Sequence, residues 1–102
     1  MKVIITENRV FRVAKKVLTK KFGDLTPLVY DDEPNIVYYI NKERALYFVY
    51  TNGDNYCEIG DNIWDFLTDT FGFDDDQIQE VIKEWLEDYY NLNNVSVLKS
   101  EW

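Results

Sequence analysis

Residues 36–59 read IVYYINKERALYFVYTNGDNYCEI, and this stretch decides the fold. It contains three runs of β-branched and aromatic residues, at 36–40, 46–50 and 56–59, and these residue types favour strands. Residues 41–44 form a turn between the first two runs, and Asn52-Gly53, a strong signal for a two-residue hairpin, joins the second to the third. The stretch therefore predicts a three-stranded antiparallel meander.

The turn lengths set the register of this meander. They predict four cross-strand pairs: Phe48 with Cys57, Leu46 with Ile59, Phe48 with Val37, and Leu46 with Tyr39. One face of the sheet then holds Val37, Tyr39, Leu46, Phe48, Tyr50, Cys57 and Ile59. The other face holds Ile36, Tyr38, Ile40, Tyr47, Val49, Tyr56 and Glu58. Because a solvated antiparallel face is normally polar, we expect the second face to be covered at least in part.

A first helix precedes the meander. Apolar residues recur at helical spacing from Val10 to Phe22 and fill one half of the helix circumference. Thr6 is a suitable N-cap, and Gly23 stands where a C-terminal cap belongs. The pattern predicts a helix over about 7–21.

A second helix follows the meander. Asp61 or Asn62 is its expected N-cap, and Gly72 is expected to end it. The aromatic and aliphatic residues of this helix and of the next are expected to form the part of the hydrophobic core that the helices supply. Its expected buried members are Trp64, Leu67, Phe71, Trp85 and Leu86.

A third helix begins at a variant capping box, in which Asp74 and Gln77 are three residues apart, and runs to about residue 91. Two short apolar segments leave alternatives open. Residues 28–30 form either an edge strand or an irregular segment, and residues 95–98 either add a short strand or do not. The fold class is therefore α+β, in the order helix, three-stranded antiparallel meander, two helices, with a short C-terminal strand as an open alternative.

The chain of 102 residues fits a single domain spanning 1–102, and its 46% apolar content supplies a core. No apolar run approaches the roughly 20 residues of a membrane span. The N-terminus has too short an apolar stretch for a signal peptide. With a single cysteine, Cys57, these features predict a cytoplasmic protein without an internal disulfide.

Charge is divided unevenly along the chain. The net charge is −8, yet residues 1–22 carry +6 and the remainder carries −14. The first helix places Arg12, Lys16 and Lys20 in one i, i+4 row, and the third helix has an acidic counterpart made of Glu80, Glu84 and Asp88. Like charges at this spacing destabilise a helix by about 0.2–0.5 kcal/mol per pair. Either the rows are ordinary solvated faces, or each meets opposite charge within a homo-oligomer or on another molecule.

Several segments resemble known proteins. Residues 1–7, residues 21–25, and the block from 63–67 to 83–86 resemble short uncharacterised proteins of marine tailed phages and marine metagenomes. The similarity spans most of the chain. The resemblance implies a phage origin and a host cytoplasm, and it implies no activity, cofactor or site residues.

Catalytic chemistry has few candidates in this chain. There is no histidine, which removes the usual general base near neutral pH, the Ser–His and Cys–His nucleophilic pairs, and the commonest metal ligand. The run Asp74-Asp75-Asp76 is better explained by a helix N-terminus than by a divalent cation, and 31–33 by a solvated loop. Cys57 alternates inward on the hairpin and is expected to be buried. We therefore predict no catalytic residue, no metal site and no cofactor.

The sequence instead favours a non-catalytic interaction protein, phage-encoded and self-associating as a homodimer. The expected partner-binding residues are Arg12, Lys16, Lys20, Tyr38, Tyr47 and Tyr56. A host or phage protein is the other partner considered. The first alternative is an accessory protein that contacts nucleic acid through the basic face of the first helix. The second, less favoured, is a carboxylate enzyme that uses a divalent metal.

Overall fold

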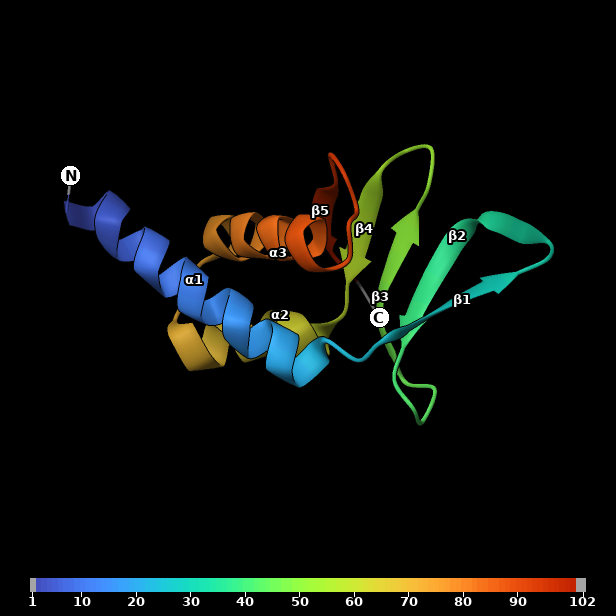
Figure 1. Cartoon of the computed structure of the whole chain (residues 1–102), viewed down its shortest axis with the longest axis horizontal. Coiled ribbons are helices and arrows are strands. Elements are labelled where there is room, and N and C mark those ends of the chain that lie inside the picture. Colours follow the sequence, from blue (N-terminus) through green and yellow to red (C-terminus); the bar gives the residue numbers. More distant parts are fainter. Residues whose placement is uncertain (1, 101–102) are drawn as a thin grey trace.

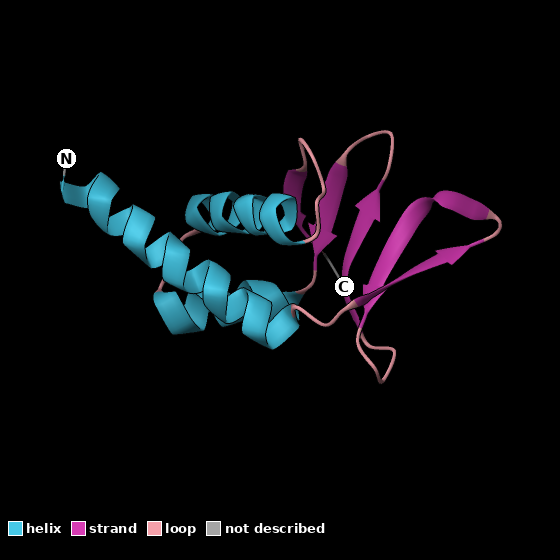
Figure 2. Cartoon of the chain, in the orientation of Figure 1, coloured by secondary structure: helices cyan, strands magenta, loops and turns pink. Residues whose placement is uncertain are grey.

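A computed structural model describes the backbone of residues 2–100 and the side chains of residues 9–100. The described residues form three helices that lie together beside a five-stranded sheet (Figure 1, Figure 2). In chain order, the elements are α1 (Lys2–Phe22), β1 (Thr26–Tyr30), β2 (Glu33–Ile40), β3 (Leu46–Thr51), β4 (Tyr56–Ile59), α2 (Asp61–Phe71), α3 (Asp75–Tyr89) and β5 (Ser96–Lys99). The α+β class is confirmed. No helix of the described residues has both the length and the apolar character needed to cross a membrane.

The sheet is larger than the sequence predicted. Its strand order is β1-β2-β3-β4-β5, in which the first four strands are antiparallel and β5 runs parallel to β4. The predicted meander is its centre. The two segments that the sequence left open both became edge strands, β1 with Pro27 on one side and the four-residue β5 on the other. An edge position suits proline, which has no N–H to donate to a ladder.

The predicted two-residue turn at Asn52-Gly53 is wrong. The strands instead pair Thr51 with Tyr56, so the loop contains residues 52–55. The backbone N–H of Asn55 donates to the Thr51 carbonyl at 2.9 Å, and the left-handed residues are Gly53 (φ 105°) and Asn55 (φ 54°). A two-residue turn of this sequence needs Asn52 and Gly53 in that region instead.

The pairing of β3 with β4 is therefore displaced by two residues from the prediction. Phe48 lies opposite Ile59, and Tyr50 lies opposite Cys57. Because side chains alternate with a period of two, this shift leaves the paired residues of β3 and β4 on their predicted faces. Phe48 and Cys57 are both fully buried on the same side of the sheet, as expected.

A bulge changes the faces between β2 and β3. Tyr39 pairs with Phe48, but the next pair is Ile40 with Leu46, so Tyr47 is an extra residue on β3. An extra residue reverses the facing of those that follow it in the ladder. Leu46 therefore lies on the second face rather than the first. Tyr47, predicted on the second face, packs against Phe22 of α1 with 5.5 Å between ring centroids.

The core lies between the helices and one face of the sheet. Trp85 of α3 packs edge-on against Phe48, and Tyr90 packs against Phe48 and Tyr39. Of the predicted core residues, Trp64, Leu67, Trp85 and Leu86 are buried and Phe71 is half-buried. This helix-covered face thus holds the residues that form the core of the sheet.

Helix α1 begins at Lys2, five residues before the predicted start, so Thr6 lies within the helix rather than at its N-cap. The side chains of Thr6 and Glu7 lie outside the described residues. At the other end, Gly23 follows the helix without a left-handed backbone, and a Cβ there would collide with the carbonyl oxygen of Thr19. Gly23 is therefore needed for close approach rather than for an αL cap.

Both ends of α2 are formed by glycine. The N-cap of α2 is Gly60, with no side-chain cap, so the prediction of Asp61 or Asn62 is wrong. Gly72 ends α2 in the left-handed conformation (φ 67°), as predicted.

The N-terminus of α3 confirms the capping box. The carboxylate of Asp74 accepts from the N–H of Gln77 at 2.8 Å, and the Gln77 side chain accepts from the N–H of Asp74 at 2.9 Å. The helix ends at Tyr89, two residues earlier than predicted.

Candidate interaction surface

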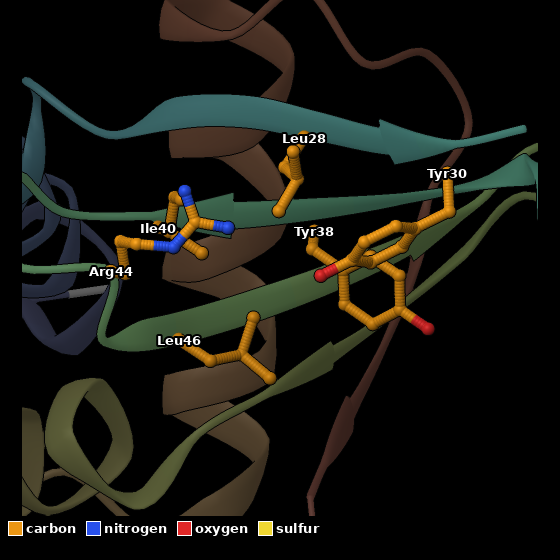
Figure 3. A pocket seen from close by; sticks show the side chains of 6 residues that line it. All are labelled: Leu28, Tyr30, Tyr38, Ile40, Arg44 and Leu46. Carbon is orange, nitrogen blue, oxygen red and sulfur yellow. The ribbon is translucent and has the colours of Figure 1, made fainter.

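No helix of the described residues covers the second face of the sheet. Figure 3 looks onto this face, with the helix behind the strands. The pairing registers align one row of residues across all five strands: Leu28, Tyr38, Val49, Glu58 and Leu98. We call this surface the open face. Its apolar and aromatic residues are Leu28, Tyr30, Ile36, Tyr38, Ile40, Leu46, Val49, Tyr56 and Leu98.

A hollow of about 380 Å³ lies on the β1–β3 part of the open face. Its lining residues are Leu28, Tyr30, Tyr38, Ile40, Arg44 and Leu46. Figure 3 shows Arg44 at one end and the two tyrosines at the other, with the aliphatic side chains between them. The rings of Tyr30 and Tyr38 meet edge to face, with centroids 5.5 Å apart. The hollow is thus apolar in the middle and different in chemistry at its two ends.

The tyrosine end is acidic. The Tyr38 hydroxyl donates to Oε1 of Glu33 at 3.1 Å, and this hydrogen bond raises the pKa of Tyr38 above its ordinary value. Glu33 and the neighbouring Asp31 and Asp32 are exposed at the β1–β2 turn. Among the described side chains, ion pairs join only Lys15 to its two acidic partners, so these three carboxylates have no cation within 4.0 Å.

The opposite end is held by a fixed turn. The side-chain oxygen of Asn41 accepts from the backbone N–H groups of Glu43 (2.9 Å) and Ala45 (2.8 Å). The N–H of Arg44 donates to the Asn41 carbonyl at 3.0 Å, and Arg44 itself has a left-handed backbone (φ 66°). These contacts set where the Arg44 side chain leaves the turn. Arg44 is exposed, and no described carboxylate lies within ion-pair distance of it.

The charged rows of α1 and α3 meet only in part. Lys15 lies beside the basic row and pairs with Glu84 at 3.1 Å and with Asp88 at 3.3 Å. Partial burial lowers the pKa of Lys15, but the hydrogen bonds to these two carboxylates outweigh it and raise the pKa above its ordinary value. Part of the acidic row on α3 thus meets its opposite charge within the same chain, at Lys15 of α1.

The six predicted partner-binding residues fall into three places. Tyr38 and Tyr56 lie on the open face, whereas Tyr47 packs against α1. The basic residues Arg12, Lys16 and Lys20 are exposed on α1. The structure does not place the basic row on the open face with Tyr38 and Tyr56.

Sequence reasoning missed four residues of the hollow: Leu28, Tyr30, Arg44 and Leu46. Leu46 was predicted on the other face, and the bulge at Tyr47 changes its facing. Leu28 and Tyr30 alternate within the short apolar segment that was left open between strand and irregular chain. That alternation was the available signal. Nothing in the pattern around Arg44 marks it, because its position depends on the turn geometry.

Reactive groups are few in the described part of the chain. No group of three or more His, Cys, Asp and Glu side chains gathers there in a way that could hold a metal ion. Cys57 is fully buried, and this burial raises the pKa of its thiol to about 12, so the thiol is neutral near pH 7. No protein-family model, curated protein or solved structure matches the chain.

Proposed function

We propose that this chain is a non-catalytic interaction protein that binds a second copy of itself through the open face of its sheet. The single observation that carries this proposal is an apolar, aromatic sheet face that no described helix covers. Contiguous apolar patches of several hundred Å² are rare on monomers and usually mark an interaction site. The resemblance to marine phage proteins supports a host cytoplasm as the setting.

The occupant of this face is best supplied by the chain itself. Two-fold pairing is the commonest way in which soluble proteins bury such a patch, and sheets readily pack face to face. Pairing through the β1 edge is less favourable, because Pro27 interrupts the row of donors along that edge. Leu98 and Tyr30, at opposite sides of the face, are 48% and 46% exposed and remain available to a partner.

A lysine at the centre of the face tests this proposal. Val49 lies between Tyr38 and Glu58 in the sheet, so Val49→Lys gains an opposite charge as its cross-strand neighbour and should preserve the fold. The matched control is Thr70→Lys, at an exposed site on α2. We expect light scattering to show a dimer for the wild type and the control, and a monomer for Val49→Lys. A dimer that survives Val49→Lys unchanged would rule out the open face.

A second candidate function is nucleic-acid contact through α1. It is supported by the exposure of Arg12, Lys16 and Lys20, none of which has a described carboxylate within ion-pair distance. Counterion release predicts that three phosphate contacts give a slope of about −3 in a plot of log affinity against log salt concentration. Fluorescence anisotropy with labelled single- and double-stranded DNA measures this slope. The net charge of −8 opposes such binding, so the self-association proposal is preferred.

A further inference from the structure

We propose that the two copies pair with their strands antiparallel, so that Arg44 of each copy lies over Tyr30, Tyr38 and Glu33 of the other. This inference rests on the proposed function and adds the geometry and chemistry of the contact. It arises from the hollow on the open face, whose two ends carry opposite charge along the direction of the strands.

The two ends of the hollow carry opposite charge, and neither forms an ion pair among the described side chains. Arg44 follows β2 at the Ile40 end, and Glu33 begins β2 at the other end, beside the Tyr30–Tyr38 pair. In Figure 3 the Arg44 side chain extends from its turn toward the hollow, with its guanidinium beside Ile40 and in front of the strands. A cation at one end and carboxylates at the other make the face complementary to a reversed copy of itself.

Symmetry selects the orientation. A two-fold axis that lies in the interface and crosses the strands reverses strand direction while keeping β1 over β1. It therefore places the Arg44 end of one copy over the Glu33 end of the other, and it does so twice. An axis parallel to the strands would instead keep strand direction and reverse the strand order, so that β1 of one copy lies over the β5 side of the other. Arg44 of each copy would then stay at the level of the other copy's Arg44 and would not reach its acidic turn, which disfavours that arrangement.

The chemistry at the contact suits a guanidinium. Arginine stacks on aromatic rings and pairs with carboxylates in a fork geometry, and the acidic end offers both groups side by side. The Tyr38 hydroxyl already donates to Glu33, so the carboxylate is held next to the rings before a partner arrives. The aliphatic residues Leu28, Ile40 and Leu46 between the ends would be buried in the same step.

Paired charge reversals test the inference on the full chain. We expect Arg44→Glu to raise the dimer dissociation constant about 10- to 100-fold, because each dimer then contains two facing sets of carboxylates. Glu33→Lys should also weaken the dimer, by less, because Asp31 and Asp32 remain. An equimolar mixture of the two variants should form a heterodimer of near wild-type affinity, since each contact again joins opposite charges. Sedimentation velocity with one variant fluorescently labelled measures all three.

The net charges make this mixture a controlled comparison. The net charge of Arg44→Glu is −10 and that of Glu33→Lys is −6, so their heterodimer carries the same total charge as two wild-type chains. The matched control for Arg44→Glu is Arg12→Glu, which makes the same charge change at an exposed site on α1. Circular dichroism melting confirms that each variant is folded. We expect Arg12→Glu to dimerise like the wild type.

The outcomes separate this inference from the proposed function. Restored pairing in the mixture supports the antiparallel contact. A wild-type dimer that is broken by Val49→Lys but is indifferent to Arg44→Glu overturns the contact and leaves the open-face dimer standing. A dimer weakened by Arg12→Glu instead assigns the interface to the charged rows and overturns both. A wild type that stays monomeric also overturns both proposals. This holds even if the open face binds a different protein.

Discussion

At the scale of single residues, the molecule is organised around Trp85. Its side chain is 1% exposed, its ring packs against Phe48 and Tyr90, and its indole N–H donates to Oγ1 of Thr19 at 3.1 Å. One side chain thus joins α3 to the sheet and to α1. A buried aromatic residue with a satisfied polar atom contributes both area and orientation to a core.

We expect Trp85→Ala to lower the free energy of unfolding by about 3–5 kcal/mol, the usual loss for a large core aromatic. Urea denaturation followed by circular dichroism measures this loss. The control is Val13→Ala, because Val13 is 52% exposed on α1 and its truncation should have little effect. A loss below about 1 kcal/mol for Trp85→Ala would contradict the core described here.

The buried thiol of Cys57 and the half-buried hydroxyl of Tyr90 make the stability of the fold depend on alkaline pH. Burial raises the pKa of Cys57 and of Tyr90 to about 12 each, above their ordinary values. Because the pKa values are higher in the folded state, the unfolded chain loses these protons at lower pH than the folded chain does. The contribution of the two groups to the free energy of unfolding is therefore complete below about pH 9 and is lost as the pH rises toward 12. We expect the urea midpoint to fall over this range.

The Cys57→Ala variant separates the two contributions. It removes the thiol titration, so its midpoint should fall less steeply between about pH 9 and 10.5 than that of the wild type, while the Tyr90 contribution at higher pH remains. A wild-type midpoint that is constant up to pH 11, or rapid labelling of native Cys57 by a thiol reagent at pH 8, would contradict this burial.

At the scale of elements, the end of α3 caps the end of α1. The Tyr89 hydroxyl donates to the carbonyl of Gly23 at 2.8 Å, and the Tyr90 hydroxyl donates to the carbonyl of Phe22 at 2.6 Å. The last carbonyls of a helix have no partner within the helix, so these two hydroxyls satisfy groups that would otherwise need water. The contact also explains how two elements far apart in sequence are fixed side by side.

Removing a single hydroxyl tests this cap. We expect Tyr90→Phe to lower the free energy of unfolding by about 1 kcal/mol, the usual net contribution of a hydrogen bond. Tyr89→Phe should cost less, because Tyr89 is 43% exposed and water can replace it. Chemical denaturation of both variants makes the comparison. An equal or larger loss for Tyr89→Phe would show that the half-buried hydroxyl of Tyr90 is not the stronger cap.

The elements that the sequence predicted well are those with strong local signals. The capping box at Asp74 and the left-handed end at Gly72 depend on a few neighbouring residues, and both are present. The register of the hairpin was missed because Asn55, and not Asn52, adopts the left-handed backbone. At the bulge, Tyr47 packs against the ring of Phe22 from a distant helix, a contact that no local pattern reveals.

The candidate surface was predictable only in part for the same reason. The alternation of the meander strands placed Tyr38, Val49 and Tyr56 on a second apolar face, and the registers agree. The hollow also needs β1 and the Arg44 turn, which were left open or unmarked. The opposite charges at its two ends therefore could not be predicted from the sequence, because they depend on how β1 pairs with β2.

At the scale of the whole molecule, one sheet face is buried under helices and the other is left apolar. The helices satisfy the hydrophobic requirement of the first face through Phe48, Cys57 and Ile59, all of which are fully buried. The second face has no such cover among the described residues. The basic row on α1, whose three residues are all exposed, is a separate surface.

The most direct test of the central claim is sedimentation equilibrium of the wild-type chain and of Val49→Lys, from low micromolar to near-millimolar concentration. A dimer through the open face predicts that the wild-type mass rises to twice the chain mass of 12.2 kDa, while Val49→Lys stays at 12.2 kDa throughout. A wild type that remains a 12.2 kDa species at the highest concentration would contradict self-association through this face.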